Sequence, residues 1–201
     1  MRKVGGIVLC GGQSTRMGQP KAWLPFAREL MLSRVVRLLG QAVQPIVVVA
    51  APDQDVPPLQ HDVTIVRDEE KGRGPLEGLA AGLGYLSGKV DAAYLSSCDV
   101  PFLVPGFVRR LVELLENQAV CVPHVGGLYH PLAAVYRLDV LGSVRALLAE
   151  NRLRPVFLFD KVSTCIVSEA DLADVDPTLQ SLRNLNTPEE YQAALQQQID
   201  N

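Results

Sequence analysis

The sequence predicts a single α/β domain with three layers, a Rossmann-like fold in which a mostly parallel mixed sheet carries helices on both faces. Three observations support this fold class. Short apolar runs alternate along the chain with helical segments of about ten residues. The run PIVVVAA over Pro45–Ala51 is apolar at consecutive positions, as in strands that are buried on both faces. A glycine-rich loop directly follows the first apolar run.

The first half of the chain is predicted to form four strands and two helices. The strands are short apolar runs, the first of which is rich in β-branched residues. The first helix has apolar residues at positions 32, 35, 36 and 39, which share one helical face, and the glycines of the second helix indicate close packing on the sheet. The strands are Lys3–Leu9, Pro45–Ala51, Val63–Arg67 and Ala92–Ser97, and the helices are Leu30–Leu39 and Leu76–Leu86.

The second half continues the alternation with a helix over Pro105–Glu116 and a strand over Ala119–Pro123. The order of strands and helices is least clear from the sequence between residues 125 and 176. There, GGLYHPLAAVY is typical of a turn and a strand, and Leu138–Leu148 of a helix.

A last helix is predicted after Thr187, which is suited to cap it. Pro188 takes the first helical position, and Glu189 and Glu190 complement the positive end of the helix. No internal repeat, low-complexity segment or linker interrupts the pattern, so we expect one domain over residues 1–201.

Composition and charge exclude several classes of function. The formal charge of −3 argues against a broad nucleic-acid-binding surface, which is usually basic. The apolar stretch near the N-terminus is too short for a signal peptide, and no apolar run reaches the roughly 18 residues that span a bilayer. The cysteines are scattered without a C-x-x-C pair, which is typical of reduced thiols. We therefore expect a cytoplasmic protein that binds neither nucleic acid nor membranes.

The loop LCGGQSTRMGQPK over residues 9–21 has the chemistry of a polyphosphate site. Gly11 and Gly12 allow backbone N–H groups to approach an anion. Arg16 can fork onto phosphate oxygens, and Lys21 can act as a mobile point charge. The loop matches neither the P-loop nor the G-x-G-x-x-G pattern, which disfavours a dinucleotide redox cofactor. The alternative is a glycine-rich turn with a solvated arginine and lysine.

Three further positions belong to the same edge of the predicted sheet, where ligands of open α/β sheets bind. Asp99 follows a buried strand and is a candidate ligand of a hard cation such as Mg²⁺, or a capping residue before Pro101. Asp68 opens a charged loop that could equally be solvated surface. Gly74, Pro75 and Leu76 begin a helix whose N-terminus could receive an anion or a base edge, or could serve only as a helix start.

The loop resembles the signature LAGGxSxRMGxxK of nucleotidyltransferases that activate small phosphorylated acceptors, and most closely that of the molybdenum cofactor guanylyltransferases. Further blocks resemble this family in order and cover nearly the whole chain: VRD ending at Asp68, GPL at 74–76, CDVP at 98–101, HP at 130–131 and NLNTPEE at 184–190. The resemblance implies a fold of the nucleotide-diphospho-sugar transferase type. Residues of about 1–100 would bind the nucleotide, and residues of about 101–201 the acceptor.

The activity implied by the resemblance is transfer of GMP from GTP to the terminal phosphate of molybdopterin, with Mg²⁺ as cofactor and release of pyrophosphate. The backbone of Leu9, Cys10 and Gly11 would hold the guanine and ribose. Arg16 and Lys21 would act on the triphosphate as catalytic groups, together with Asp99, which would bind Mg²⁺. Asp68 would approach the nucleotide. Other proteins of cofactor biosynthesis, or target enzymes, are further implied partners.

The resemblance has two departures and leaves alternatives open. Cys10 replaces the usual alanine, and Ala50 stands where some members carry an asparagine that contacts the nucleotide. Cytidylyl relatives tend to carry alanine at the position of Gly12, so Gly12 favours guanine over cytosine. The alternatives are a cytidylyltransferase acting on molybdopterin or another phosphorylated acceptor, and a non-catalytic nucleotide-binding adapter.

The acceptor is expected to meet polar side chains of the second half. His130 belongs to a block that the resemblance implies is near the acceptor, although a structural role is the default for a histidine. Arg154 could meet an acceptor phosphate or remain exposed. Asn184 and Asn186 flank Leu185 and therefore point to one face of an extended segment. The expected chemistry is in-line attack on the α-phosphorus, in which an anionic phosphate nucleophile needs no general base.

Overall fold

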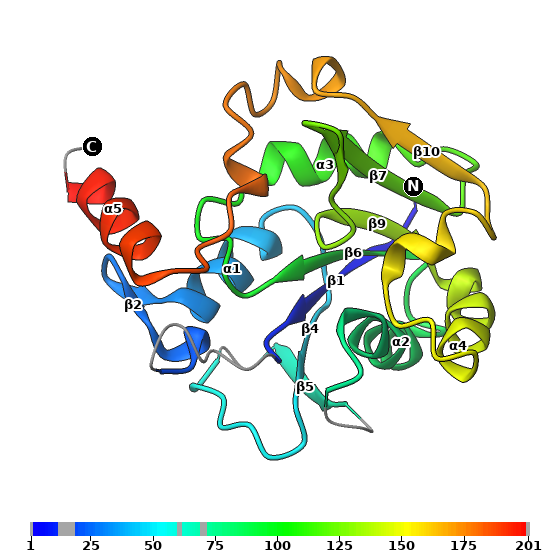
Figure 1. Ribbon diagram of the computed structural model, residues 1–201, viewed down its shortest axis with the longest axis horizontal. Helices are drawn as coiled ribbons and strands as arrows, with labels where there is room; N and C mark the ends of the chain where they lie inside the picture. The colour runs from blue at the N-terminus through cyan, green and yellow to red at the C-terminus, as the bar shows by residue number, and fades with distance from the viewer. Residues whose placement is uncertain (1, 12–18, 60–61, 69–71, 200–201) are drawn as a thin grey trace.

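A mixed sheet forms the middle layer of the molecule (Figure 1). The computed structural model describes residues 2–11, 19–59, 62–68 and 72–199, and within these residues the sheet has eight strands. Their order is β10-β7-β9-β6-β1-β4-β5, and β8 pairs with β7 at the side of this path. The strands are β1 (Val4–Leu9), β4 (Ile46–Ala50), β5 (Val63–Arg67), β6 (Ala92–Ser97), β7 (Val120–Val125), β8 (Leu128–Tyr129), β9 (Ala134–Arg137) and β10 (Thr164–Val167).

The strands β6, β1, β4 and β5 lie side by side and run in the same direction. From β1 the chain adds β4 and then β5 on one side, and then returns to place β6 on the other side of β1. In the described part of this sheet, the antiparallel pairs are those that β9 forms with β6 and β7 and that the short β8 forms with β7. The sheet is therefore mostly parallel, as predicted, and its topology switches direction at β1, where ligand sites of open α/β sheets form.

Helices cover both faces of the sheet, which confirms the three-layer prediction (Figure 1). On one face, α1 (Met31–Gly40) and α3 (Pro105–Leu114) bury their apolar side chains in a cluster with Val8 and Tyr94. On the other face, α2 (Pro75–Leu86) and α4 (Leu141–Ala149) pack in a cluster with Ile7 and Leu95. Alternate residues of β1 thus serve the two faces, as expected for a central strand. The short 3₁₀ helices are Lys21–Trp23, Leu138–Val140, Pro155–Leu158, Ala170–Leu172 and Gln180–Leu182.

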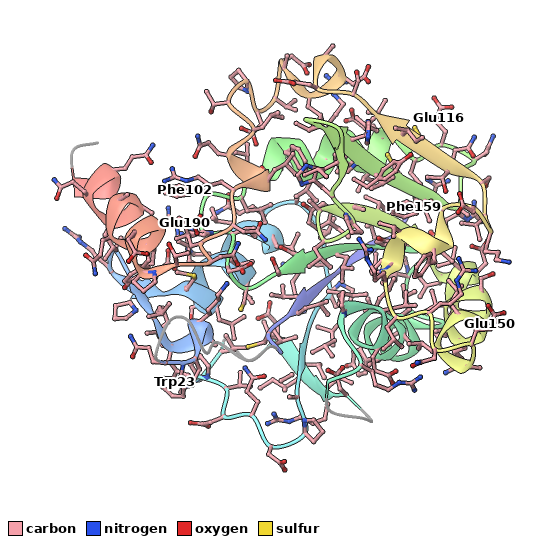
Figure 2. All side chains as sticks on the ribbon, in the orientation of Figure 1. Trp23, Phe102, Glu116, Glu150, Phe159 and Glu190 are labelled. Carbon is pink, nitrogen blue, oxygen red and sulfur yellow. The ribbon has the colours of Figure 1, made fainter. Side chains whose placement is uncertain are left out.

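A third, smaller apolar cluster fixes the C-terminal helix. Helix α5 (Pro188–Ile199) packs on the two-stranded sheet formed by β2 (Pro25–Phe26) and β3 (Glu29–Leu30). The hydroxyl of Tyr191 donates a hydrogen bond to the carbonyl of Pro25. Phe102, labelled in Figure 2, packs edge-on against Phe26 with ring centroids 5.5 Å apart. These contacts hold the C-terminal segment beside the N-terminal hairpin, far apart in sequence.

Most elements lie where the sequence predicts them, with a few corrections. Helix α3 ends at Leu114 instead of Glu116, because Glu116 adopts a positive φ of 38° and the chain leaves the helix there. The predicted helix over 138–148 begins with a 3₁₀ turn, and α4 itself starts at Leu141. The sequence does not predict β2, β3 or β10, which are short or at the sheet edge. No helix among the described residues is both long and apolar enough to cross a membrane.

The glycines of α2 bring this helix unusually close to the sheet, as predicted. A Cβ atom at Gly78 would lie 2.7 Å from Leu9 Cδ2, and one at Gly82 would lie 2.7 Å from Ile7 Cγ2. Both distances are too short for a Cβ atom unless the neighbour moves; the end of the Leu9 side chain can move, whereas the β-branched Ile7 is stiffer, so Gly82 is the more constrained position. The close approach places the N-terminal end of α2 beside the carboxyl end of β1.

Substituting Gly82→Ala should destabilise the protein. Its new methyl group would overlap the stiff, β-branched Ile7 side chain, and we expect the free energy of unfolding to fall by about 1–3 kcal/mol. Gly142→Ala is the matched control, since Gly142 lies on α4 with open space around it. There the free energy should stay constant or rise by up to about 1 kcal/mol. Urea denaturation of both variants measures this, and equal effects would contradict the packing argument.

Candidate active site at the carboxyl edge of the sheet

A cavity of about 1090 Å³ opens at the carboxyl ends of β1, β4, β5 and β6. The residues that follow these four strands, Gly11, Ala51, Asp68 and Asp99, all line it. The main-chain ladder continues just beyond the strands, since Cys98 N donates to Leu9 O at 3.0 Å and Asp68 N to Ala50 O at 2.9 Å. The sheet therefore holds the first residues of each loop in register, and the cavity has a rigid floor.

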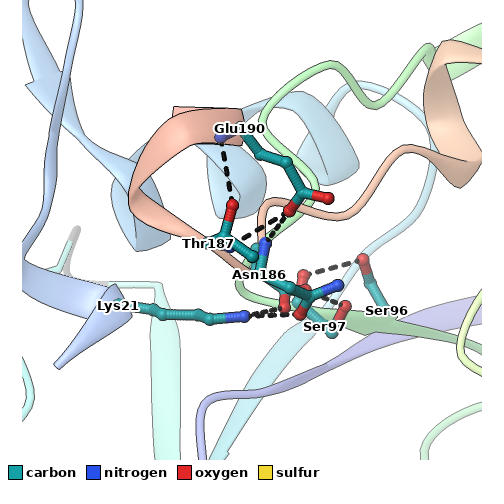
Figure 3. Close-up of polar contacts among 7 residues, drawn as sticks. Lys21, Ser96, Ser97, Asn186, Thr187 and Glu190 are labelled. Atoms are coloured by element: carbon teal, nitrogen blue, oxygen red, sulfur yellow. Dashed lines mark hydrogen bonds and ion pairs between the residues drawn. The ribbon is translucent and has the colours of Figure 1, made fainter. Parts of the chain in front are cut away.

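The polar centre of the cavity is the ammonium group of Lys21 (Figure 3). Lys21 Nζ lies 2.6 Å from Asp99 Oδ2 and 2.8 Å from Asn186 Oδ1. The other carboxylate oxygen, Asp99 Oδ1, accepts a hydrogen bond from Ser97 Oγ at 2.6 Å. Asp99 is 8 % exposed, so its charge is largely removed from water and is balanced by these donors.

The residues before α5 bring Asn186 to this centre because the chain is fixed on either side of it, at Leu185 and at the start of the helix. Leu185 N donates to Asp99 O at 2.9 Å, and the Leu185 side chain is buried in the third apolar cluster. A capping box follows, in which Glu190 N donates to Thr187 Oγ1 at 3.2 Å and Glu190 Oε2 accepts from Thr187 N at 3.1 Å. The same carboxylate oxygen accepts from Asn186 N at 2.6 Å (Figure 3). The main chain of Asn186 is thereby fixed, and its side-chain oxygen Oδ1 accepts the hydrogen bond from Lys21.

Gln54 fixes the main chain at the start of the glycine-rich loop. Its Nε2 donates to Cys10 O at 2.8 Å and to Cys10 Sγ at 3.3 Å, and its Oε1 accepts from Ala51 N at 3.2 Å. Gln54 also lines the cavity. Sequence reasoning noted the missing asparagine at Ala50 but not this residue. The structure thus provides an amide group at this side of the cavity from a position four residues further along the chain.

Asp68 has a buried carboxylate oxygen, Oδ1, with no hydrogen-bond partner among the described residues. Burial, and then the charge of Glu77, raise its pKa to about 6. Glu77 is itself buried at the start of α2, with Arg73 Nη1 3.6 Å from its Oε2. A lone acceptor that lines a cavity is costly unless a ligand supplies a donor. Asp68 is therefore suited to accept a hydrogen bond from a ligand hydroxyl or N–H group.

A second cavity of about 240 Å³ adjoins the first, since Leu132 and Asn184 line both. His130, Pro131 and Tyr129 form its other side, and burial lowers the pKa of His130. Apart from His130, this smaller cavity is lined largely by apolar side chains such as Val100 and Leu132, so it is less polar than the region around Lys21. It lies on the acceptor side expected from the sequence.

Most of the predicted site residues meet at the two cavities. The main cavity is lined by Leu9, Cys10, Gly11, Lys21, Asp68, Gly74, Pro75, Asp99, Asn184 and Asn186, and the second by His130 and Asn184. Gly12 and Arg16 lie outside the residues that the structure describes, so their roles stay predictions. The structure does not bring Leu76 or Arg154 to either cavity.

These two positions differ from the prediction for physical reasons. Gly74, with a φ of 78°, turns the chain into α2 so that Pro75 faces the cavity and Leu76 faces the sheet. Leu76 is completely buried in the apolar cluster below. Arg154 is exposed directly before a 3₁₀ helix. Sequence reasoning also missed Ser97 and Gly78. The position of Ser97 as the last strand residue before Asp99 was the available signal.

Comparison with known proteins identifies relatives for this arrangement. Residues 6–164 match a family described as the MobA-like NTP transferase domain. A relative from Methanothermobacter thermautotrophicus, named "Probable molybdenum cofactor guanylyltransferase", is 36 % identical over 191 residues, which cover 91 % of this chain and 94 % of the relative. This agrees with the resemblance that the motifs carry.

Solved structures show the same fold. The molybdopterin-guanine dinucleotide biosynthesis protein A of Archaeoglobus fulgidus has a TM-score of 0.82 at 18 % identity and covers 98 % of this chain and 100 % of its own. A Mycobacterium tuberculosis protein crystallised in complex with manganese has a TM-score of 0.63 at 15 % identity, covering 96 % of this chain and 98 % of its own. The predicted fold class is thereby confirmed.

Replacing Asp68 with asparagine should stabilise the protein at neutral pH. The carboxyl keeps its proton to about pH 6 in the folded chain and only to its ordinary value of 3.8 in the unfolded chain. Ionisation therefore costs stability increasingly from about pH 4 to 6, and the full cost is present above that range. We expect Asp68→Asn to raise the free energy of unfolding at pH 7.5 by on the order of 1 kcal/mol, after allowance for screening by solvent.

Most of the gain should disappear at about pH 4, where the folded carboxyl of the unchanged protein is protonated and the pH is close to the unfolded pKa of 3.8. Urea denaturation at the two pH values measures the difference. Asp62→Asn is the control, because Asp62 is exposed at the opposite end of β5. A gain for Asp68→Asn that is equal at both pH values would contradict a raised carboxyl pKa.

Proposed function

The chain belongs to the MobA-like NTP transferase family, and from this premise we propose that it transfers GMP from GTP to the terminal phosphate of molybdopterin and releases pyrophosphate. The observation that carries the proposal is the centre formed by Lys21, Asp99 and Asn186. It lies between the glycine-rich segment on one side and the smaller cavity on the other. A group that moves from nucleotide to acceptor would have to pass such a position.

The size of the cavity supports two substrates. At about 1090 Å³ it lies at the upper limit of about 1,000 Å³ that is usual for small-molecule sites. A nucleoside triphosphate near Gly11 and Gln54 would leave its phosphates near Lys21. The acceptor would approach from the side of Asn184 and His130, so that its phosphate meets the α-phosphorus between the two halves.

The side-chain oxygen atoms around Asp99 are suitable ligands for a hard divalent cation. Carboxylate, amide and hydroxyl oxygens of Asp99, Asn186 and Ser97 meet here, and Mg²⁺ prefers oxygen ligands. Among the described residues there is no group of three or more histidine, cysteine, aspartate or glutamate side chains that could hold a metal ion. A cation at Asp99 would therefore complete its coordination with phosphate oxygens and water. When bound, Mg²⁺ would neutralise charge on the phosphates.

The residues of the chain contribute alignment and charge. Lys21 is confined by its two acceptors before a substrate arrives, so that its positive charge is already placed for the triphosphate. Ser97 orients Asp99, and the capped segment of α5 orients Asn186. The acceptor phosphate is an anion and attacks without a general base. Arg16 would add a second positive charge to the leaving pyrophosphate.

Asp68 supports guanine over cytosine. Its carboxylate lies near Gly11, where a Cβ atom would be 3.7 Å from Asp68 Oδ2, while the buried, unpartnered Oδ1 lies on the side of Gly78. The Leu9–Gly11 backbone is the segment that we expect to hold the base and ribose. Guanine offers N1–H and N2–H₂ donors to a carboxylate, whereas cytosine offers only one amino group. The preference that Gly12 implies stays a prediction of the sequence.

Turnover assays with molybdopterin should show pyrophosphate release with GTP and Mg²⁺. CTP and ATP should react at least about tenfold more slowly, because they lack the paired donors for Asp68. Thermal stabilisation by each nucleotide with Mg²⁺ gives an independent measurement. Equal or faster turnover with CTP would overturn the guanine assignment, and absence of turnover with all three would favour a nucleotide-binding adapter.

Asp99→Asn should keep the fold and remove the cation-dependent reaction. The amide preserves the shape of the side chain but loses the charge that holds the cation and Lys21, so kcat should fall by about 100-fold or more. Asp139→Asn is the matched control. Asp139 is exposed and follows β9 at the opposite edge of the sheet, where its Oδ2 lies 3.2 Å from Arg137 Nε. Normal turnover in the Asp99 variant would refute its proposed role.

A further inference from the structure

Two cysteines lie opposite each other on the floor of the main cavity. Cys10 directly follows β1 and Cys98 directly follows β6, which are neighbours in the sheet (Figure 1). Leu9 pairs with Ser97, and Cys98 N donates to Leu9 O at 3.0 Å, so the cysteines form the next opposing pair. Neighbouring strands are about 4.8 Å apart, and disulfides join Cα atoms at about 4.4–6.8 Å. The backbone geometry thus permits a bond between them.

The two side chains are also on the same face of the sheet. Both belong to the apolar cluster under α1 and α3, which places the two sulfur atoms on one side of neighbouring strand ends. They are 4 % and 6 % exposed, yet both line the main cavity, so that small molecules reach them only through it. The proposed transfer reaction uses neither sulfur atom.

We propose that Cys10 and Cys98 form a thiol-modification site, which exchanges with low-molecular-weight disulfides to give a reversible Cys10–Cys98 disulfide. We further propose that this disulfide and a bound nucleoside triphosphate exclude one another. Cys10 is the first to react, because Gln54 Nε2 donates a hydrogen bond to its sulfur at 3.3 Å and so favours the thiolate there.

The exchange balances in two steps. The Cys10 thiolate attacks one sulfur of the reagent RSSR, which forms a mixed disulfide and releases one RS⁻. The Cys98 sulfur then attacks the Cys10 sulfur and displaces the second RS⁻, and the Cys98 proton passes to the departing thiolate. After protonation the products are two RSH and one protein disulfide. The two electrons lost by the cysteine pair reduce the reagent.

Exclusion of the nucleotide follows from the neighbours of the two cysteines. Gly11 comes directly after Cys10 and Asp99 directly after Cys98, and both line the cavity. A disulfide brings the two sulfurs to about 2.05 Å, which turns both cysteine side chains and removes the thiol that Gln54 Nε2 contacts at 3.3 Å. The contacts that hold the start of the glycine-rich loop therefore change on the floor of the proposed nucleotide site. A bound nucleotide would conversely cover the floor through which the reagent must pass.

The chain contains a matched control pair. Cys121 and Cys165 are also register partners on neighbouring parallel strands, β7 and β10, with hydrogen-bonded thiols. Neither of them lines one of the two cavities. Reaction at this second pair should therefore not respond to a nucleotide.

The test uses the full chain, reduced and then treated with oxidised glutathione, in the Cys121→Ser/Cys165→Ser background and in the unchanged sequence. Peptide mass spectrometry after non-reducing digestion measures the disulfide between Cys10 and Cys98. We expect the bond to form and to be reversed by dithiothreitol. With Mg²⁺ and GTP at ten times its Kd, formation should slow about tenfold, whereas any Cys121–Cys165 bond should form at an unchanged rate.

A Cys98→Ala variant separates the two exchange steps. It should stop at the mixed disulfide of glutathione with Cys10, and a variant that remains unmodified would overturn Cys10 as the first thiol to react. Absence of a Cys10–Cys98 bond in the unchanged sequence would overturn the site. If the Cys10–Cys98 disulfide forms as fast with each of saturating GTP, CTP and ATP as without nucleotide, the mutual exclusion is wrong. Protection by CTP or ATP alone would support this inference and contradict the guanine assignment.

Discussion

The position of the Lys21 ammonium group determines the geometry of the site, because it joins three distant parts of the chain. Its acceptors on Asp99 and Asn186 are 78 and 165 positions away in sequence. The Asp99 carboxylate is mostly removed from water and therefore needs hydrogen-bond donors, which Lys21 supplies to Oδ2 and Ser97 to Oδ1. The C-terminal segment is in turn fixed by its capping box and by the apolar cluster under α5. Loss of the ion pair would therefore disturb the loop, the sheet edge and α5 together.

The two carboxylates at this edge differ in a way that separates their chemistry. Asp99 is fully hydrogen-bonded and holds a positive charge, whereas Asp68 has a buried oxygen without a partner and a raised pKa. A folded chain gains nothing in stability from the second arrangement. Such local conflicts with stability are expected where a protein must leave a group available for a ligand. The close packing of α2 through Gly78 keeps Asp68 in this environment.

The sequence predicts the central strands and helices well, because buried parallel strands are continuous apolar runs whose identity does not depend on their neighbours. It predicts β2, β3 and β10 poorly, since such short strands exist only through the partners that they find in the fold. Topology places Asp68 and Asp99 at strand ends on the edge where ligands bind, and the glycine-rich loop and the family resemblance were needed to choose the site over a surface or capping role. Gln54 could not be assigned to the site, because it lies in a loop without periodicity, and Leu76 was misplaced because one residue along a helix changes the face by about 100°.

The reversed direction of β9 has a consequence for how this architecture can diversify. Because β9 is antiparallel to β6, with Ala134 opposite Leu95, it begins at the same edge where the parallel strands end. The second cavity is built in part from the residues that lead into β9, among them His130 and Leu132. Insertions or substitutions there can reshape the second cavity while the pairing of β6, β1 and β4 stays unchanged. Under the proposed division of the site, acceptor specificity can therefore diversify without a change in the strands that carry the proposed nucleotide site.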